Sequence, residues 1–521
     1  MHVTVPASLR SPASHRMSHE YLERILKARV YDVAIESPLE DAPRLSRRLG
    51  NAVLFKREDL QPVFSFKVRG AYNKIAHLSE TIARRGVICA SAGNHAQGVA
   101  LAARRRGIPA TIVMPQTTPR IKVQAVIDLG GEVILHGDEY DQAYEQALAV
   151  ARERQLTFIH PFDDPDVIAG QGTIGMEILR QHPGDTLDAI FVAVGGGGLI
   201  AGVGAYVKYL CPKIRVIGVE PEDADAMYRS LQARKRVTLE RVGIFADGVA
   251  VRRVGEEPFR LAQQYVDEVI TVSTDEICAA IQDIFEDNRS IVEPAGALPV
   301  AGIKRYVARE QCRDRRFVAI NCGANMNFDR LRHVAERADI GGQREALVAV
   351  QIPERKGSFL RFCEVLGKRN VTEFNYRYND GADAQLFVGL ALAEGRKEKE
   401  GLLASLREAG YPVVDMSDNE MAKLHVRYMV GGHGRGIAHE RLFRFEFPER
   451  PGALLKFLNA IGTQWNITLF HYRNHGSDHG RVLAGVQVPP QESVDFDLHV
   501  RELKYVYVEE TENPAYRMFV L

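Results

Sequence analysis

The last third of the chain contains an internal duplication, and this feature restricts the possible folds most strongly. The segment from Pro353 to Arg377 recurs between Pro448 and Arg473, and both copies begin Pro-Glu-Arg-x-Gly and end Thr-x-Phe-x-Tyr-Arg. The copies are offset by 95 residues at first and by 96 after a one-residue insertion near Trp465. Similarity over this length is improbable by chance, so the region is a tandem repeat.

Each copy is predicted to fold as a small α+β domain. The pattern indicates strand, helix, strand, strand, helix and strand over about seventy residues, the split βαβ arrangement. Phe374, Tyr376 and Tyr378 alternate as on a half-buried strand, and so do Phe470 and Tyr472.

Three histidines in the second copy, His471, His475 and His479, recur every four residues. The first lies on a predicted strand and the others in a loop, so they do not share a helix face. We therefore expect solvated or structural histidines and no metal site.

Before the duplication, the chain alternates short β-rich runs with longer segments of helical periodicity. This alternation predicts βαβ units, that is, an α/β domain with parallel sheet covered by helices, whose ligands bind beyond the C-terminal ends of the strands. Strands are expected at Val87–Ala90, Ala110–Met114, Glu132–Leu135, Ala189–Val194, Arg215–Val219 and Phe317–Ile320, and helices at Ala96–Arg106, Arg120–Leu129, Asp141–Arg154 and Thr274–Asp287.

Composition limits the class of protein. A chain of 521 residues is expected to form two or three domains. Its 67 basic and 67 acidic residues give zero net charge, which favours neither nucleic acid nor an anionic membrane. Six scattered cysteines fit reduced thiols in the cytoplasm. No apolar run approaches the roughly 20 residues of a membrane span.

The predicted domain division follows from these patterns. Residues 1–19, with Pro6, Ser8, Pro12 and Ser14, are expected to be a flexible leader, with Met17 as an alternative start. The first domain is expected at 20–335, and the repeats at 346–417 and 440–511, joined by Gly431–Gly436.

Two strand-end loops favour an anion. In Ser91–Gly98, small residues and the start of a helix would let backbone N–H groups meet a carboxylate or phosphate. Alternatively, Asn94 is simply a helix N-cap. Four consecutive glycines at 195–198 suit a backbone wrapped around a phosphate. However, Gly196-x-Gly198-x-x-Ala201 with Glu220 also fits a dinucleotide fingerprint.

Two further stretches carry reactive side chains. Cys322 follows a strand in Asn321–Asn327, although a lone cysteine is more often an inert apolar residue. Lys67, in Ser65-Phe-Lys-Val-Arg-Gly70, is set among aromatic and small residues that could desolvate its amine and make it a Schiff-base nucleophile. By itself, however, such a lysine is more often a solvated surface residue.

Taken together, these blocks resemble the fold-type II pyridoxal-phosphate enzymes, most closely the biosynthetic threonine dehydratases, from about residue 20 to the C-terminus. The resemblance implies that Lys67 forms the internal aldimine with pyridoxal 5'-phosphate and acts as the catalytic base. It also implies the remaining site residues: Phe66 and Asn94 at the cofactor, with Asn94 on its ring oxygen; Gly195, Gly196, Gly197, Gly198 and Leu199 at its phosphate; Cys322 at its ring nitrogen; and Ser91, Ala92, Gly93 and Asn94 at the substrate carboxylate.

The implied reaction converts threonine to 2-oxobutanoate and ammonia, the first step of isoleucine synthesis. A neutral thiol at the ring nitrogen would not hold that nitrogen protonated, which favours rapid loss of the β-hydroxyl. Many related dehydratases carry serine where Cys322 stands, so a serine-preferring dehydratase is an alternative. A nicotinamide-dependent oxidoreductase and a non-catalytic amino-acid sensor are alternatives from other classes.

The duplicated region resembles paired ACT-like regulatory domains, which implies inhibition by isoleucine, opposed by valine, in a homotetramer. A structural dimerisation module is the alternative. From the aromatic strand ends and the apolar periodicity we expect the effector pocket near Tyr376, Tyr472, Leu454, Leu458 or Ile461.

Overall fold

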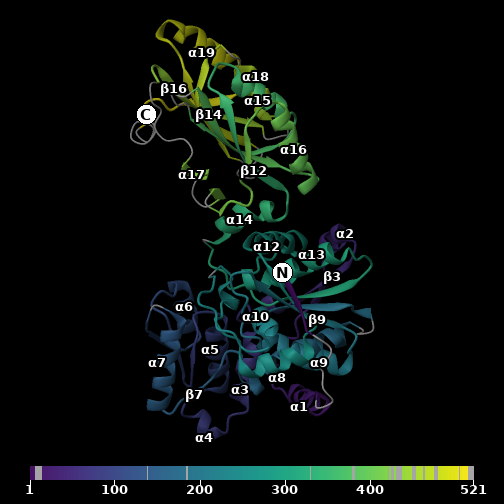
Figure 1. The fold of residues 1–521 in the computed structure, drawn as a ribbon. Coiled ribbons are helices and arrows are strands. Elements are labelled where there is room, and N and C mark those ends of the chain that lie inside the picture. The colour runs from purple at the N-terminus through teal and green to yellow at the C-terminus, as the bar shows by residue number, and fades with distance from the viewer. Residues whose placement is uncertain are drawn as a thin grey trace. The chain divides into compact units, whose positions relative to one another are not determined.

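The computed structural model separates into two compact units, Met1–Gly341 and Gly342–Leu521, each described by itself (Figure 1). The first unit ends at Gly341 and not near residue 335, because the last helix of that unit continues to Gly341. The structure describes residues 1–5, 14–137, 139–182, 186–243, 245–328, 330–377, 382–420, 422–423, 427–429, 437–448, 453–461, 464–473, 479–503 and 505–513.

The larger sheet of the first unit has seven strands, of which the five inner ones are parallel. In the middle of the sheet, Val318 pairs with Ile190 on one side and Leu54 on the other. The strands, in spatial order, are β1 (His2–Thr4), β10 (Glu268–Val272), β9 (Arg215–Pro221), β8 (Ala189–Ala193), β11 (Arg316–Asn321), β3 (Ala52–Arg57) and β2 (Leu39–Asp41).

The smaller sheet has four parallel strands. Its two central strands are buried along their whole length, as their continuous apolar sequences require in a parallel sheet covered on both faces. In spatial order the strands are β6 (Glu132–Leu135), β5 (Ala110–Met114), β4 (Val87–Ala90) and β7 (Thr157–Phe158).

Helices follow the strands in the expected alternation, so the α/β prediction for this region is confirmed. The α-helices are α1 (Ser14–Leu26), α2 (Pro43–Leu49), α3 (Lys67–Ala76), α4 (Glu80–Ala83), α5 (Asn94–Arg106), α6 (Arg120–Asp128), α7 (Tyr140–Glu153), α8 (Pro165–Gln181), α9 (Gly198–Leu210), α10 (Ala226–Ala233), α11 (Glu256–Tyr265), α12 (Thr274–Asn288), α13 (Pro294–Glu310) and α14 (Arg330–Gly341), with 3-10 turns η2 (Glu58–Leu60) and η4 (Asp247–Val249).

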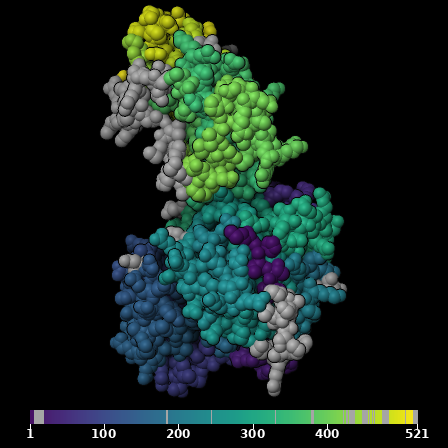
Figure 2. Space-filling view, viewed as in Figure 1, coloured from purple at the N-terminus to yellow at the C-terminus, as the bar shows by residue number. Residues whose placement is uncertain are grey.

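The N-terminus corrects one prediction. Residues 1–19 were expected to form a flexible leader, but His2–Thr4 form the edge strand β1, antiparallel to β10. Val5 is buried, and α1 begins at Ser14. The first residues, purple in Figure 2, lie on the surface of the first unit. The edge strand is stabilised by pairing with residues far along the chain, which local composition cannot reveal.

The second unit contains one eight-stranded sheet built from both repeats. Each repeat has the predicted order of strands and helices. The first consists of β12 (Glu345–Pro353), α15 (Ser358–Leu366), β13 (Val371–Arg377), β14 (Asp383–Ala391), α16 (Arg396–Glu408) and β15 (Val413–Asp415). The second consists of β16 (Glu440–Pro448), α18 (Ala453–Ile461), β17 (Asn466–Arg473), β18 (His479–Gln487), α19 (Ser493–Glu502) and β19 (Val506–Glu509); the short helices α17 (Arg427–Met429) and η6 (Pro490–Glu492) lie outside this pattern.

The two repeats join through antiparallel pairing of β13 with β17. Phe374 pairs with Tyr472, and Tyr376 with Phe470. Because Phe374 and Phe470 are equivalent in the duplication, as are Tyr376 and Tyr472, the pairing is symmetric about Asn375 opposite His471. The repeats therefore share one continuous sheet and one aromatic core.

Within the described residues, no helix is long and apolar enough to cross a membrane. The same residues bring no three His, Cys, Asp or Glu side chains together as metal ligands. Of the three histidines discussed above, His471 is exposed on β17, and His475 lies outside the described residues. Tyr378, predicted to alternate with Phe374 and Tyr376, also lies outside them. All six cysteines are described and form no disulfide.

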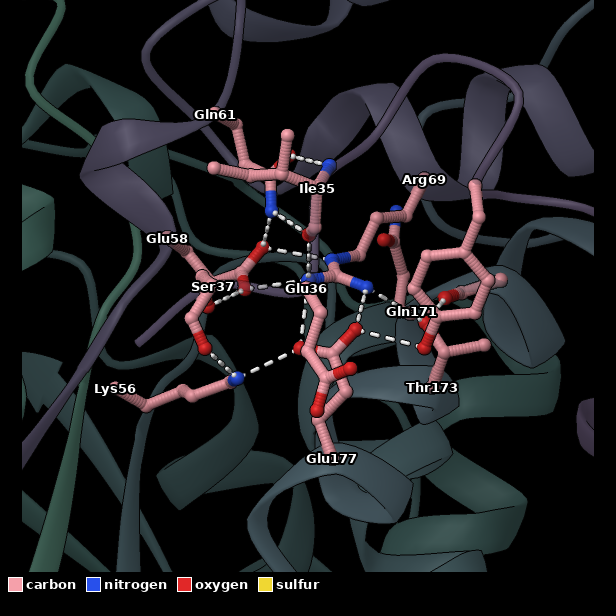
Figure 3. Close-up of polar contacts among 12 residues, drawn as sticks. Ile35, Glu36, Ser37, Lys56, Glu58, Gln61, Arg69, Gln171, Thr173 and Glu177 are labelled. Carbon is pink, nitrogen blue, oxygen red and sulfur yellow. Dashed lines mark hydrogen bonds and ion pairs between the residues drawn. The ribbon is translucent and has the colours of Figure 1, made fainter. Parts of the chain in front are cut away.

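A network of buried charges anchors α3, the helix that begins at Lys67 (Figure 3). Arg69 on α3 binds both oxygens of Glu58, at 2.7 Å each. It also binds both oxygens of Glu177 on α8, at 2.6 and 3.0 Å. Lys56 on β3 binds the same Glu177 at 2.6 Å, and none of these four side chains is exposed.

The remaining donors of this network are also satisfied. The guanidinium of Arg69 donates further bonds to Thr173 and to the carbonyl oxygen of Ile35. Lys56 donates to the carbonyl oxygen of Ser37 and to Gln181. Two positive and two negative charges therefore balance with their hydrogen bonds complete, which is the condition under which buried ions are tolerated. The network fixes α3 to β3 and α8.

We expect Glu177→Gln to leave an uncompensated positive charge and to destabilise the first unit by about 3–5 kcal/mol. Urea unfolding followed by circular dichroism should show an earlier transition. Fluorescence of Trp465, the single tryptophan, reports on the second unit and should change less. Glu23→Gln, which removes an exposed ion pair with Lys27, is the control and should leave both transitions in place. An unchanged transition in Glu177→Gln would contradict a stabilising role for the network.

Candidate active site

The sequence-predicted residues come together around Lys67, the first residue of α3. Gly98 on α5 lies against the Lys67 backbone, since a Cβ there would be 3.2 Å from its carbonyl carbon. The backbone N–H of Phe66 donates to the Cys322 carbonyl oxygen at 3.2 Å. The loops after β4 and β11 therefore both adjoin this lysine, as expected for the C-terminal ends of parallel strands.

The amino group of Lys67 is held by a residue that the sequence did not indicate. That residue is Pro161, whose carbonyl oxygen accepts a hydrogen bond from Nζ of Lys67 at 3.0 Å. The same Nζ lies 5.3 Å from the centre of the Phe66 ring. Burial lowers the pKa of Lys67 to about 8, and the electrostatic influence of the nearby Cys322 and Glu293 only partly opposes this effect. The amine is therefore easier to deprotonate than an ordinary lysine.

Two histidines near Lys67 stay neutral. Burial lowers the pKa of His95 to about 3 and that of His160 to about 4, and the positive charge of Lys67 contributes to both shifts. Nε2 of His95 is 2.9 Å from the Ile159 carbonyl oxygen. Nδ1 of His160 accepts the N–H groups of Phe162 and Asp163. Both rings therefore serve as neutral packing and hydrogen-bonding groups.

The loop Ser91–Asn94 connects β4 to α5 and keeps partial exposure. Gly93 is the N-cap of α5, so the alternative that Asn94 caps the helix is wrong. The Asn94 side chain instead donates to Glu293 at 2.6 Å and accepts from Asn325 at 2.7 Å. No acidic residue lies in the first turn of α5 itself, so the acidic side chain at this N-terminus is Glu293, which comes from another part of the chain.

At each of the four glycines before α9, the structure leaves no room for a side chain or requires a backbone conformation that favours glycine. A Cβ at Gly195 would be 2.9 Å from the Val249 backbone, and one at Gly196 would be 2.2 Å from the Phe162 ring. Gly197 has φ +94°, and a Cβ at Gly198 would be 3.0 Å from the Phe162 carbonyl oxygen. No side chain caps α9, so its first N–H groups remain suited to an anion. Leu199, the second residue of α9, is buried.

The surroundings of Cys322 and Glu220 determine the state of the thiol and bear on the dinucleotide alternative. The Cys322 thiol is buried and donates to the Ala295 carbonyl oxygen at 3.4 Å. Burial raises its pKa well above the ordinary value, so the thiol is neutral. Glu220 accepts the backbone N–H groups of Met227 and Tyr228. Its carboxylate thus caps α10, and it is not free to bind a ribose as a dinucleotide site would require.

These residues fit pyridoxal phosphate. A desolvated lysine amine can form its Schiff base, a glycine-lined helix N-terminus without a side-chain cap can hold its phosphate, and a neutral thiol can face its ring nitrogen. The sequence did not reveal Pro161, Phe162, Glu293 or Asn325 as parts of the site. Glu293-Pro294 has the pattern of a helix start with proline at its first position, which gives no hint of a contact with Asn94.

Family comparisons agree with both units. Residues 30–323 match the model for pyridoxal-phosphate dependent enzymes. Residues 336–426 and 431–520 match the model for the C-terminal regulatory domain of threonine dehydratase.

Individual relatives cover nearly the whole chain. A biosynthetic L-threonine dehydratase of Burkholderia multivorans is 58% identical over 506 residues, which are 96% of this chain and 99% of the relative. The Escherichia coli protein of that name is 54% identical over 501 residues, or 96% and 97% of the two chains.

Solved structures match about two thirds of the chain. The processed form of threonine deaminase isoform 2 from Solanum lycopersicum is 47% identical with a TM-score of 0.61, covering 65% of this chain and 97% of that chain. Maize serine racemase is 33% identical with a TM-score of 0.57, covering 60% and 96%. The chain therefore belongs to the pyridoxal-phosphate-dependent enzymes and, within them, to the threonine dehydratases with C-terminal regulatory domains.

Proposed function

We propose that this enzyme dehydrates and deaminates L-threonine to 2-oxobutanoate and ammonia at the Lys67 site, as a lyase of isoleucine biosynthesis. The observation that carries the proposal is the convergence of Lys67, the α5 and α9 N-termini and Cys322 at the C-terminal ends of strands from both sheets. Relatives named as biosynthetic threonine dehydratases support it over the full length.

Lys67 is the proposed base. With a pKa of about 8, its amine is partly neutral at physiological pH and can accept the Cα proton of the substrate. Pyridoxal phosphate, when bound, supplies the electron sink that makes this proton acidic. The Pro161 carbonyl oxygen accepts a hydrogen bond from the amine and holds it in place without adding charge.

The two helix N-termini are proposed to bind the two anions of the reaction. The loop Ser91–Asn94 at the start of α5 would receive the substrate carboxylate. Gly195–Leu199 at the start of α9 would hold the cofactor phosphate, and Phe162 holds this loop in shape through its contacts with Gly196 and Gly198. The neutral Cys322 would face the ring nitrogen without protonating it.

We expect Lys67→Ala to abolish the visible absorbance of the bound cofactor and to lower keto-acid formation from threonine by at least about 10³-fold. Lys74→Gln is the control, because Lys74 lies on the same helix but pairs with Asp164 and Asp166. Undiminished turnover in Lys67→Ala would contradict the assignment. A higher kcat/KM for serine than for threonine would select the serine-preferring alternative.

For regulation, we propose that the second unit binds isoleucine in a cavity between α15, β12 and the start of β17. Two of the five predicted effector residues, Tyr376 and Leu458, line this cavity. Tyr472, Leu454 and Ile461 are buried in the surrounding core and are not among its lining residues. The cavity of about 30 Å³ has room for roughly one or two waters. An amino acid would therefore select a wider state of the unit.

The chemistry of the cavity lining suits a branched α-amino acid. The Tyr376 hydroxyl donates to one oxygen of Glu354 at 2.6 Å, while the other oxygen and Nε1 of Trp465 are buried without a partner among the described residues. The free carboxylate oxygen could accept from an ammonium group, and the indole N–H could donate to a carboxylate. The apolar part of the lining would take the side chain; it comprises Ile352, Phe359, Leu360, Leu458 and Ile467.

We expect Glu354→Gln to raise the isoleucine concentration for half inhibition about tenfold, because it removes one charged hydrogen bond. The measurement is threonine turnover against isoleucine concentration, with and without valine. Glu364→Gln, on the exposed face of α15, should keep the wild-type response. Equal inhibition of both variants would place the effector elsewhere. Homotetramer assembly and a cytoplasmic location stay predictions.

A further inference from the structure

Glu293 is a buried carboxylate that the proposed reaction has not used. It is the residue before α13, only 3% exposed, and its backbone N–H donates to the Gly323 carbonyl oxygen. A residue at this position usually turns its side chain back to cap the helix. Glu293 makes no such cap, and its carboxylate instead reaches Asn94 on α5.

Two glycines make room for this carboxylate. A Cβ at Gly323 would be 2.5 Å from Oε1 of Glu293, and one at Gly248 would be 3.2 Å away. The backbone N–H of Asn325 donates to the same carboxylate. The surrounding backbone is thus shaped around Glu293, which argues against a side chain that is buried by chance.

The hydrogen bonds of Asn94 fix which way its amide faces. Its Oδ1 accepts a hydrogen bond from Nδ2 of Asn325 at 2.7 Å. The other N–H of that Asn325 nitrogen donates to the Val63 carbonyl oxygen. Nδ2 of Asn94 donates one of its two N–H groups to Glu293 at 2.6 Å. One N–H group of Asn94 therefore remains for the ring oxygen of the cofactor.

Several charged or titratable groups face Glu293. They are Lys67 and Cys322, together with Asp247 and Lys122, which pair with each other at 2.7 Å. Burial raises the pKa of Glu293 to about 7, and the negative charge of Asp247 raises it further. The hydrogen bonds from Asn94 and the Asn325 N–H and the positive charge of Lys122 act in the opposite direction. Glu293 can therefore change its charge near neutral pH.

We propose that Glu293 is a positioning residue that directs the free N–H of Asn94 to the cofactor ring oxygen, and that its charge tunes the cofactor through Asn94. This inference rests on the proposed function, because it assumes pyridoxal phosphate at Lys67. A charged Glu293 accepts strongly from Asn94, and a protonated one accepts weakly, so the hydrogen bond offered to the ring oxygen changes with pH.

The first test is the visible spectrum of the holoenzyme, which responds to hydrogen bonding at the ring oxygen. In the wild type, the band should shift between about pH 6 and pH 8 with a midpoint near 7. His95, His160 and Cys322 titrate outside this window. Glu293→Gln keeps an acceptor for Asn94 but cannot change charge, so its spectrum should stay constant over the same range.

The second test asks whether Glu293 acts through Asn94. Pyridoxal phosphate affinity is measured by reconstituting the apoenzyme. Glu293→Ala should weaken binding about tenfold, and Glu293→Gln much less. In an Asn94→Ala background, Glu293→Ala should add less than about twofold, because the group that it orients is gone.

Asp283→Asn controls for general destabilisation, since it removes a buried carboxylate that pairs with Arg48 and Lys304. It should lower the melting temperature without changing the spectrum or the cofactor affinity. A wild-type band that is constant with pH, a transition that persists in Glu293→Gln, or additive effects with Asn94→Ala would each overturn the inference. A wild type that develops no visible band with pyridoxal phosphate would instead count against the proposed function.

Discussion

The active site depends on four charges that are buried together beneath α3. Arg69, Glu58, Glu177 and Lys56 have no exposed surface, and an unpaired ion in such a place would be destabilising by several kcal/mol. Their mutual pairing therefore allows essentially one arrangement of β3, α3 and α8. Helix α3 leads the chain from the larger sheet towards the smaller one, and α8 leads it back. Lys67 lies two residues before Arg69, so this network also determines where the reactive amine is held.

The glycine-rich loop before α9 shows how packing and ligand binding constrain the same residues. The sequence suggested that four glycines wrap around a phosphate. In the structure, Gly196 and Gly198 are also required by Phe162, and Gly195 by the Val249 backbone. Phe162 in turn follows Pro161, the partner of the Lys67 amine. The loop that suits the phosphate and the contact that holds the lysine are thus adjacent parts of one packed structure.

Local sequence predicted the strands well because most are short apolar runs that alternate with longer segments of helical periodicity. It predicted β4, β5 and β6 with their observed bounds, and it predicted the repeat pattern from the duplication. It could not predict contacts between residues far apart in the chain. Asn94 and Glu293 are separated by 199 positions, and β1 exists only because it pairs with β10. Sheet order and the partners of side chains depend on such contacts, and no local pattern records them.

The pKa of Lys67 depends on which of the buried groups around it carry a charge. His95, His160 and Cys322 are all desolvated, and each is held in its neutral form. Pro161 offers only a carbonyl oxygen. Glu293 is a carboxylate that interacts electrostatically with Lys67, and burial raises its own pKa to about 7. A fully charged partner would hold Lys67 protonated, whereas no anion at all would lower its pKa further. A carboxylate that is itself close to neutral keeps the lysine at a pKa of about 8, where it can both accept and release a proton.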